Sequence, residues 1–164
     1  MPECIICRRK VLVVDQKGLC GECRAAATLE VATRLDTIYL HYRTVQGSDD
    51  FEECLKSCDL IIKEAEALLP YEKLEIEVAP PLPSEIIDMM REIKDDIIME
   101  EAERLLQSLD ANTAADSSRL PIPPPPCGEV ALKLQELKSM MSAPSRLADI
   151  EREFEEKYRT SIMD

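Results

Sequence analysis

Apolar residues recur at intervals of three and four along most of this chain, the spacing of one face of an α-helix. This pattern predicts two amphipathic helices, over residues 29–46 and 49–69, joined at Gly47 and Ser48 into an antiparallel hairpin. Ser48 suits the N-cap of the second helix, and Pro70 is expected to end it. The apolar series are Val31, Leu35, Ile38, Tyr42 and Val45 in the first, and Phe51, Leu55, Cys58, Ile62, Ala65 and Leu69 in the second.

A third long helix is predicted over residues 84–109, beginning at Ser84. Its apolar face starts as Ile86, Met90, Ile93 and Ile97, then shifts beyond Glu100 to Ile98, Ala102, Leu105 and Leu109. Residues 111–128, which include the proline run 121–126, are predicted to be an extended linker. Two short helices are expected in residues 129–164, on either side of Pro144, with apolar series Val130, Leu134, Leu137, Met141 and Leu147, Ile150, Phe154, Tyr158.

The first 23 residues have a different pattern, dominated by cysteines. Cys4 and Cys7 form one CxxC pair, twelve residues follow, and Cys20 and Cys23 form a second. Each pair can offer two thiolates to one ion, at Zn–S distances of about 2.3 Å. We therefore predict a structural Zn²⁺ site. Four thiolates leave no coordination position for a substrate, so catalysis at this ion is not expected.

The apolar run at residues 10–14 and the turn at residues 15–18 predict a β-hairpin between the two CxxC pairs. The second pair runs directly into the helix-forming residues Arg24, Ala25, Ala26 and Ala27. In this arrangement the first quarter of the chain, residues 4 to about 40, resembles a treble-clef zinc finger. The resemblance implies a knuckle, a hairpin and a helix whose first turn supplies the last two ligands.

The predicted fold is therefore mainly α. It comprises a small treble-clef zinc module of a β-hairpin plus helix, a helical bundle or coiled-coil hairpin, and C-terminal helices. The expected organisation is a zinc finger running into the first long helix (1–46), a helical hairpin or bundle (47–110), a Pro-rich linker (111–128) and C-terminal helices (129–164).

Charge is distributed unevenly along the 164 residues. The net charge is −13, yet residues 1–34 carry +2, and residues 48–110 carry −13. No apolar run is long enough to cross a membrane, and the N-terminus lacks the pattern of a signal peptide. Seven cysteines, four of them in metal-ligand spacing, suit a reducing compartment, so we expect a cytoplasmic protein.

These features favour a non-enzymatic zinc-binding interaction or regulatory protein, an acidic helical adaptor or inhibitor. Its expected partners are a protein that is basic or itself binds nucleic acid, and a second copy of the chain in a homo-oligomer, with a dimer favoured. The alternative is a nucleic-acid-binding transcriptional regulator whose zinc module contacts phosphates. The residues for that contact would be Arg8, Arg9, Lys10, Lys17 and Arg24.

Two further sites, for a second metal ion and for a magnesium-dependent enzyme, are less favoured than these interpretations. Cys54 and Cys58, with His41 and Cys127, offer ligands for a second metal, but the positions of Cys54 and Cys58 favour core packing. Carboxylates spaced like the magnesium ligands of all-α nucleotide pyrophosphatases recur in the third helix, but Lys56 stands where a partner motif beginning at Glu52 would need its last glutamate. No catalytic residue is therefore predicted. The carboxylates are Glu85, Asp88, Glu92, Asp95 and Asp96.

Overall fold

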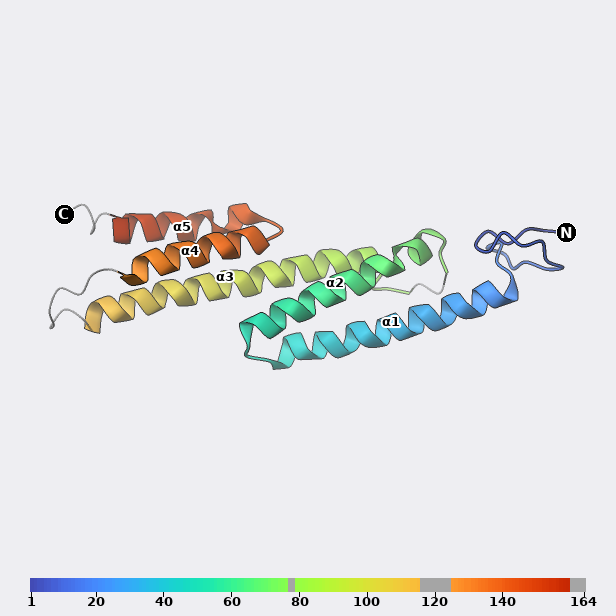
Figure 1. Cartoon of the computed structure of the whole chain (residues 1–164), viewed down its shortest axis with the longest axis horizontal. Helices are drawn as coiled ribbons and strands as arrows, with labels where there is room; N and C mark the ends of the chain where they lie inside the picture. The colour runs from blue at the N-terminus through green and yellow to red at the C-terminus, as the bar shows by residue number, and fades with distance from the viewer. Residues whose placement is uncertain (77–78, 116–124, 160–164) are drawn as a thin grey trace. The chain divides into compact units, whose positions relative to one another are not determined.

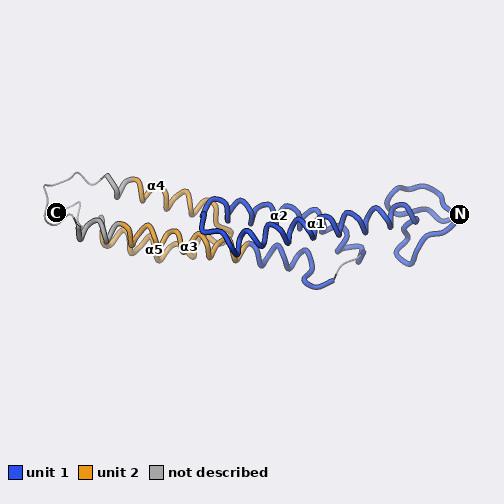
Figure 2. Tube along the Cα trace, turned by 90° about the horizontal axis from the view of Figure 1, so that it is seen from below, with its two compact units in different colours: residues 1–90 blue, residues 91–164 orange. Residues whose placement is uncertain are grey.

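A computed structural model describes residues 1–76, 79–115 and 125–159, and these are mainly helical, as predicted (Figure 1). The long helices are α1 (Gly21–Gly47), α2 (Phe51–Lys73), α3 (Pro83–Ala115) and α4 (Pro125–Met140). A 3₁₀ turn, η2 (Pro144–Leu147), leads into α5 (Ala148–Phe154) and a π-helical turn, η3 (Glu155–Arg159). The chain divides into two compact units, residues 1–90 and 91–164, which are described separately below (Figure 2).

In the first unit, α1 and α2 pack side by side in opposite directions and form the predicted hairpin (Figure 1). The N-cap of α2 is Asp50 rather than Ser48, because the Asp50 carboxylate accepts a hydrogen bond from the backbone N–H of Glu53 at 3.2 Å. Ser48 instead donates its hydroxyl to the Glu53 carboxylate at 2.8 Å. The connection between the helices is thus held by three polar side chains.

The buried stripe of α2 matches the predicted one at Leu55, Cys58 and Ala65, but at two other positions it is shifted by one residue, and Phe51 is only half-buried. Ile61 and Leu68 are buried, whereas Leu69 is exposed and Ile62 is half-buried. On α1, Leu35 is likewise exposed. A series of alternating three- and four-residue steps fits two neighbouring phases of a 3.6-residue helix, and packing selects the phase that buries the larger area. The buried residues are Ala27, Val31 and Ile38 of α1 and Cys54, Leu55, Ser57, Cys58, Ile61, Ala65 and Leu68 of α2.

Pro70 does not end α2, contrary to the prediction, since the helix continues to Lys73. The helix ends in a Schellman motif, in which Ile76 N–H donates to Tyr71 C=O at 2.9 Å and Glu75 N–H donates to Glu72 C=O at 3.0 Å. Glu75 occupies the left-handed position of this motif, with φ of 55°. The motif turns the chain back so that Ile76 is buried against Tyr71.

Helix α3 is longer than predicted, and α4 starts earlier. Residues 111–115 and 125–128, expected in the linker, are helical, while residues 116–124 lie outside the described part. The predicted shift of the apolar face along α3 is not seen, because Met90, Ile98, Ala102 and Leu105 are buried along one continuous stripe. Ile93 and Ile97, expected on the early face, are half-buried. Among the described residues no helix is both long enough and apolar enough to span a membrane.

In the second unit, α4 and α5 turn back on each other at η2 (Figure 1). Six of the predicted apolar positions of these segments are buried, namely Val130, Leu134, Leu137, Met141, Leu147 and Ile150. Phe154 is half-buried, and the side chain of Tyr158 lies outside the described part. Asp95 of α3 is also buried, and its carboxylate accepts hydrogen bonds from the backbone N–H groups of Ser142 and Ala143 at 2.8 and 2.9 Å. This carboxylate therefore satisfies the backbone at the break made by Pro144.

Candidate metal centre

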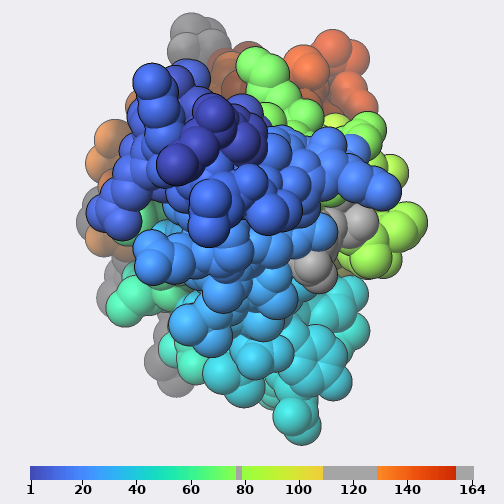
Figure 3. All heavy atoms as spheres, turned by 90° about the vertical axis from the view of Figure 1, so that its right-hand side faces the viewer, coloured from blue at the N-terminus to red at the C-terminus, as the bar shows by residue number. Residues whose placement is uncertain are grey.

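Residues 1–20 precede α1 and form a compact loop structure at its N-terminal end, facing the viewer in Figure 3. The predicted β-hairpin is not formed there. In residues 1–20, all of which are described, the only β pairing is a single antiparallel bridge between Glu3 and Lys10. The apolar run at 10–14 continues past this bridge without a ladder partner, and Leu12 and Val13 remain 82% and 75% exposed.

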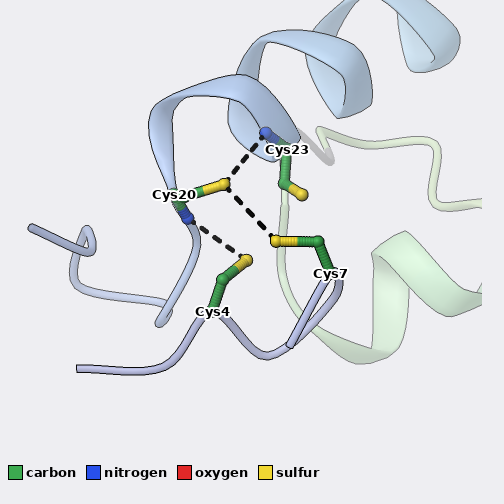
Figure 4. Close-up of side chains that lie close together, drawn as sticks. All are labelled: Cys4, Cys7, Cys20 and Cys23. Carbon is green, nitrogen blue, oxygen red and sulfur yellow. Dashed lines mark hydrogen bonds between the residues drawn. The ribbon is translucent and has the colours of Figure 1, made fainter. Parts of the chain in front are cut away.

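The first CxxC pair lies in a tight knuckle closed by backbone hydrogen bonds. Cys4 N–H donates to Arg9 C=O at 3.0 Å, and Arg8 N–H donates to Cys4 C=O at 2.9 Å. Arg8 takes a left-handed conformation, with φ of 63°, which allows the chain to reverse directly after Cys7. Both thiols of the pair consequently face the same side of the loop (Figure 4).

A second turn, at residues 15–19, brings the chain back to the knuckle. The Asp15 carboxylate accepts hydrogen bonds from the backbone N–H groups of Lys17 and Leu19, at 2.9 and 3.0 Å. The Leu19 N–H is the main reason why the pKa of Asp15 is lowered. Gly18 has φ of +83°, and a Cβ atom there would lie 3.0 Å from Ile5 Cγ2, so glycine suits this position on both grounds. Ile5 N–H donates to Gly18 C=O at 3.0 Å and joins the turn to the knuckle.

The second CxxC pair forms the first turn of α1. Cys20 is the N-cap, and its Sγ accepts a hydrogen bond from Cys23 N–H at 3.5 Å. The backbone N–H of Cys20 in turn donates to Cys4 Sγ at 3.3 Å (Figure 4). The helix start therefore directs free N–H groups and the positive end of its dipole toward sulfur atoms, which favours thiolates.

The four predicted ligands Cys4, Cys7, Cys20 and Cys23 come together. Their Sγ atoms all lie within 4.8 Å of one another, and Cys7 Sγ lies 3.9 Å from Cys20 Sγ. A tetrahedron with Zn–S bonds of about 2.3 Å has sulfur–sulfur edges of about 3.8 Å. The donor set and its spacing thus fit a metal ion such as zinc. Cys4 and Cys20 are buried, while Cys7 and Cys23 are half-buried.

The protonation of the thiols is also uneven. The backbone N–H of Cys20, followed by that of Cys7, lowers the pKa of Cys4 to about 6. Hydrogen bonding to the Cys20 thiol, then burial, raise the pKa of Cys23 to about 12. Four thiols so close together cannot all ionise without a cation between them, so a bound metal would displace protons from the cluster.

A small apolar cluster lies beneath the cysteines and joins them to the end of α2. Leu19, Ala27 and Ile76 are buried together, and Cys23, Tyr71 and Leu74 pack against them. At the surface, Lys17 forms an ion pair of 2.8 Å with Glu75. No site residue was predicted in residues 71–76. The alternation of apolar Leu74 and Ile76 with charged residues after Pro70 is the sequence signal for a segment with one buried side.

Polar contacts next to this cluster tie α1 to α2. The Tyr71 hydroxyl donates to the Glu30 carboxylate, which also accepts from Arg34 at 3.1 Å. Arg34 reaches Glu64 of α2 at 2.8 Å. The Tyr71 hydroxyl first, and then Arg34, lower the pKa of Glu30. The C-terminal part of α2 is thereby fixed against α1 about two to three turns beyond the metal ligands.

The five basic residues predicted to contact nucleic acid differ in their surroundings. Three form ion pairs with acidic residues of the same unit: Arg9 with Glu22 at 3.6 Å, Lys17 with Glu75, and Arg24 with Asp15 at 3.5 Å. Arg8 and Lys10 are exposed. These five side chains are therefore spread over the module, and most of their charge is balanced locally.

The other predicted sites are used within the protein. Cys54 and Cys58 are buried, and the Cys54 thiol donates to Ser48 C=O at 3.3 Å, in agreement with a packing role. Asp96 forms an ion pair with Arg146 at 2.6 Å, beside the buried Asp95 described above. The side chain of Cys127 lies outside the described part. Within that part, the four N-terminal cysteines are the one group arranged to hold a metal ion.

Comparison of the chain with protein-family models, with curated proteins and with solved structures finds no match.

Proposed function

We propose that this chain is a non-enzymatic, zinc-stabilised protein-interaction protein of the cytoplasm. The observation that carries the proposal is the convergence of four thiols, supplied by a knuckle and by the start of α1, to spacings that match a tetrahedral metal. Zinc is favoured over other metals because four thiolates in a closed tetrahedral set are typical of structural zinc sites. A knuckle followed by ligands on a helix start is the part of a treble clef that supports this resemblance.

The surface of the metal module favours a protein partner. Ile5, Ile6, Leu12 and Val13 are exposed on a segment that has only a small buried cluster of its own. Exposed apolar side chains on a metal-stabilised loop provide area for a protein contact, whereas phosphate contacts need unpaired cations. The local ion pairs of Arg9, Lys17 and Arg24 make the nucleic-acid alternative the second choice.

Metal content tests the first part of the proposal. The purified full-length chain is expected to hold one zinc ion per chain, measured by mass spectrometry under native conditions and by elemental analysis. Cys20→Ser should abolish stoichiometric zinc, whereas the matched control Cys54→Ser should retain it, because Cys54 lies in the helical hairpin. Equal zinc content in all three proteins, or zinc in none, would overturn the assignment.

Partner capture tests the second part. Tagged full-length protein is compared with two variants, Leu12→Ser with Val13→Ser, and Arg8→Glu with Lys10→Glu, each with and without nuclease. We expect a protein partner that survives nuclease and is lost with the apolar variant. Partners that disappear on nuclease treatment and with the charge variant would support the nucleic-acid alternative instead.

A further inference from the structure

Helix α1 has a second face that the α1–α2 hairpin leaves uncovered. Eleven residues between Ala25 and Arg43 are exposed, and only Asp36 and Arg43 among them are charged. On α2, by contrast, seven of the nine exposed residues carry a charge. In a chain in which 32% of residues are charged, an exposed helix face with so few charges is unusual and indicates a contact surface.

The uncovered face has the spacing of a coiled-coil seam. Its central residues follow intervals of 4, 3, 4, 3 and 4, and all six are exposed: Ala25, Leu29, Ala32, Asp36, Tyr39 and Arg43. Leu29 and Tyr39 are 70% and 62% exposed, and Leu40 beside the seam is 63% exposed. The Arg43 guanidinium lies 5.9 Å from the centre of the Tyr39 ring. The seam extends about 27 Å at 1.5 Å per residue.

From this seam we infer that α1 pairs with α1 of a second copy of the chain, in antiparallel orientation. Centred between Ala32 and Asp36, such a pair places Leu29 opposite Tyr39 of the partner copy. It also places the small Ala32 opposite Asp36, and the small Ala25 opposite Arg43. Each contact occurs twice about the two-fold axis: the two large apolar side chains meet each other, and each charged side chain meets an alanine that leaves room for it.

The charge of the seam permits a second copy as the occupant and favours one orientation. Two chains of net charge −13 repel each other, and their acidic α2 faces would bring like charges together. The seam has no net charge, because Asp36 and Arg43 balance, so it permits close approach of two copies. A parallel, in-register pair would place Asp36 against Asp36 and Arg43 against Arg43, which is unfavourable. The antiparallel pair offsets the two Asp36 side chains by about 6 Å along the axis, so that they are not directly opposite, and places the two Arg43 side chains at opposite ends of the seam.

This inference deepens the proposed function and rests on it, since it names a second copy as the partner of one face. The test uses the full-length, zinc-loaded chain and measures its mass by sedimentation equilibrium over a range of concentrations. A dimer is expected. Leu29→Lys and Tyr39→Glu should each weaken it by about tenfold or more in Kd, because each places a charge without a counter-charge in the seam.

The double variant, Leu29→Lys with Tyr39→Glu, distinguishes the orientations. In the antiparallel pair the two introduced charges face each other across the interface, so dimerisation should return. In a parallel pair like charges would meet, and the double variant would stay monomeric, which overturns the inference. Leu132→Lys, at a leucine of α4 that is 64% exposed, is the matched control and should leave the dimer unchanged.

Circular dichroism and zinc content confirm that each variant is folded, which is expected because the altered side chains are mostly exposed. A wild-type chain that is monomeric at every concentration also overturns the inference. This failure is distinct from failure of the proposed function, because partner capture through Leu12 and Val13 does not involve the seam.

Discussion

Residues 1–20 and the α1–α2 hairpin are neighbours in the same unit, but different forces hold them. The hairpin buries a long, mostly apolar series of side chains, in which each Val, Ile or Leu contributes about 1.5–3 kcal/mol on full burial. The N-terminal segment buries only Cys4, Leu19 and Cys20, and leaves Leu12 and Val13 in solvent. Its shape depends on backbone turns and on four thiols directed at one point. The hairpin is therefore stabilised by buried apolar area, whereas residues 1–20 depend on coordination of a metal ion.

Removing the metal should separate the two regions most clearly. Cys20→Ser, or a strong chelator, is expected to remove on the order of 10 kcal/mol of binding free energy from the N-terminal segment. The hairpin should stay helical, because its buried series does not include the ligands. Proteolysis within residues 1–20, together with little change in far-UV circular dichroism, would show this. A parallel loss of helix would mean that the hairpin also depends on the metal.

The converse change is Ile61→Ala, at a residue that is fully buried in the hairpin. Truncation there should lower the free energy of unfolding by about 2–5 kcal/mol. Zinc affinity, measured by competition with a chromophoric chelator, should change little. Leu69→Ala is the control, with an expected loss of about 1 kcal/mol or less, because Leu69 is exposed. Equal losses at both positions would contradict the observed phase of the buried stripe.

Gly18→Ala tests the turns that bring the ligands together. The left-handed backbone and the 3.0 Å approach to Ile5 predict a cost of about 1–3 kcal/mol, seen as weaker zinc binding. Gly21→Ala is the matched control in the same module, since a Cβ there meets nothing within 4 Å. An equal fall in zinc affinity in both variants would contradict a specific requirement for glycine at position 18.

The smallest effect concerns Glu30, which joins Tyr71 and Arg34 at the boundary of the two regions. Its pKa in the folded chain lies below the unfolded value of about 4.3. The stabilisation is therefore complete above that value and is lost as the pH falls through the folded pKa. Urea unfolding of wild type and Glu30→Gln should show a wild-type advantage at pH 7 that shrinks below about pH 4. An advantage that persists in acid would argue against ionisation as its source.

The sequence predicted the helices and the cysteine cluster well because both depend on local spacing. Ala27, Val31 and Ile38 follow a helical period, and two CxxC pairs need only tight turns to converge. The phase of the α2 stripe was not predictable in the same way, since Ile61 and Ile62 are equally apolar and only the partner helix distinguishes them. The absent hairpin has a similar cause: residues 10–14 suit a strand, but in the described structure their pairing stops at the Glu3–Lys10 bridge and the adjacent hydrogen bond from Val11 N–H to Pro2 C=O.

The end of α2 was missed for another reason. A proline inside a helix usually breaks it, because it has no backbone N–H to donate and its ring crowds the carbonyl four residues earlier, yet α2 continues past Pro70 to Lys73. Glu75 then adopts a conformation normally taken by glycine, and its side chain is held by Lys17, distant in sequence. A contact between residues as far apart as Lys17 and Glu75 cannot be recognised from the local spacing of apolar residues. Ile76 therefore appears as a core residue only in the folded chain.

Because Cys20 and Cys23 lie in the first turn of α1, the metal module and the hairpin share one continuous helix. In mechanical terms, α1 is a rod of 27 residues and about 40 Å, with the ion at one end and the turn into α2 at the other. A partner that binds the loops around the ion would therefore exert a torque on the whole hairpin, because no flexible segment separates these loops from α1.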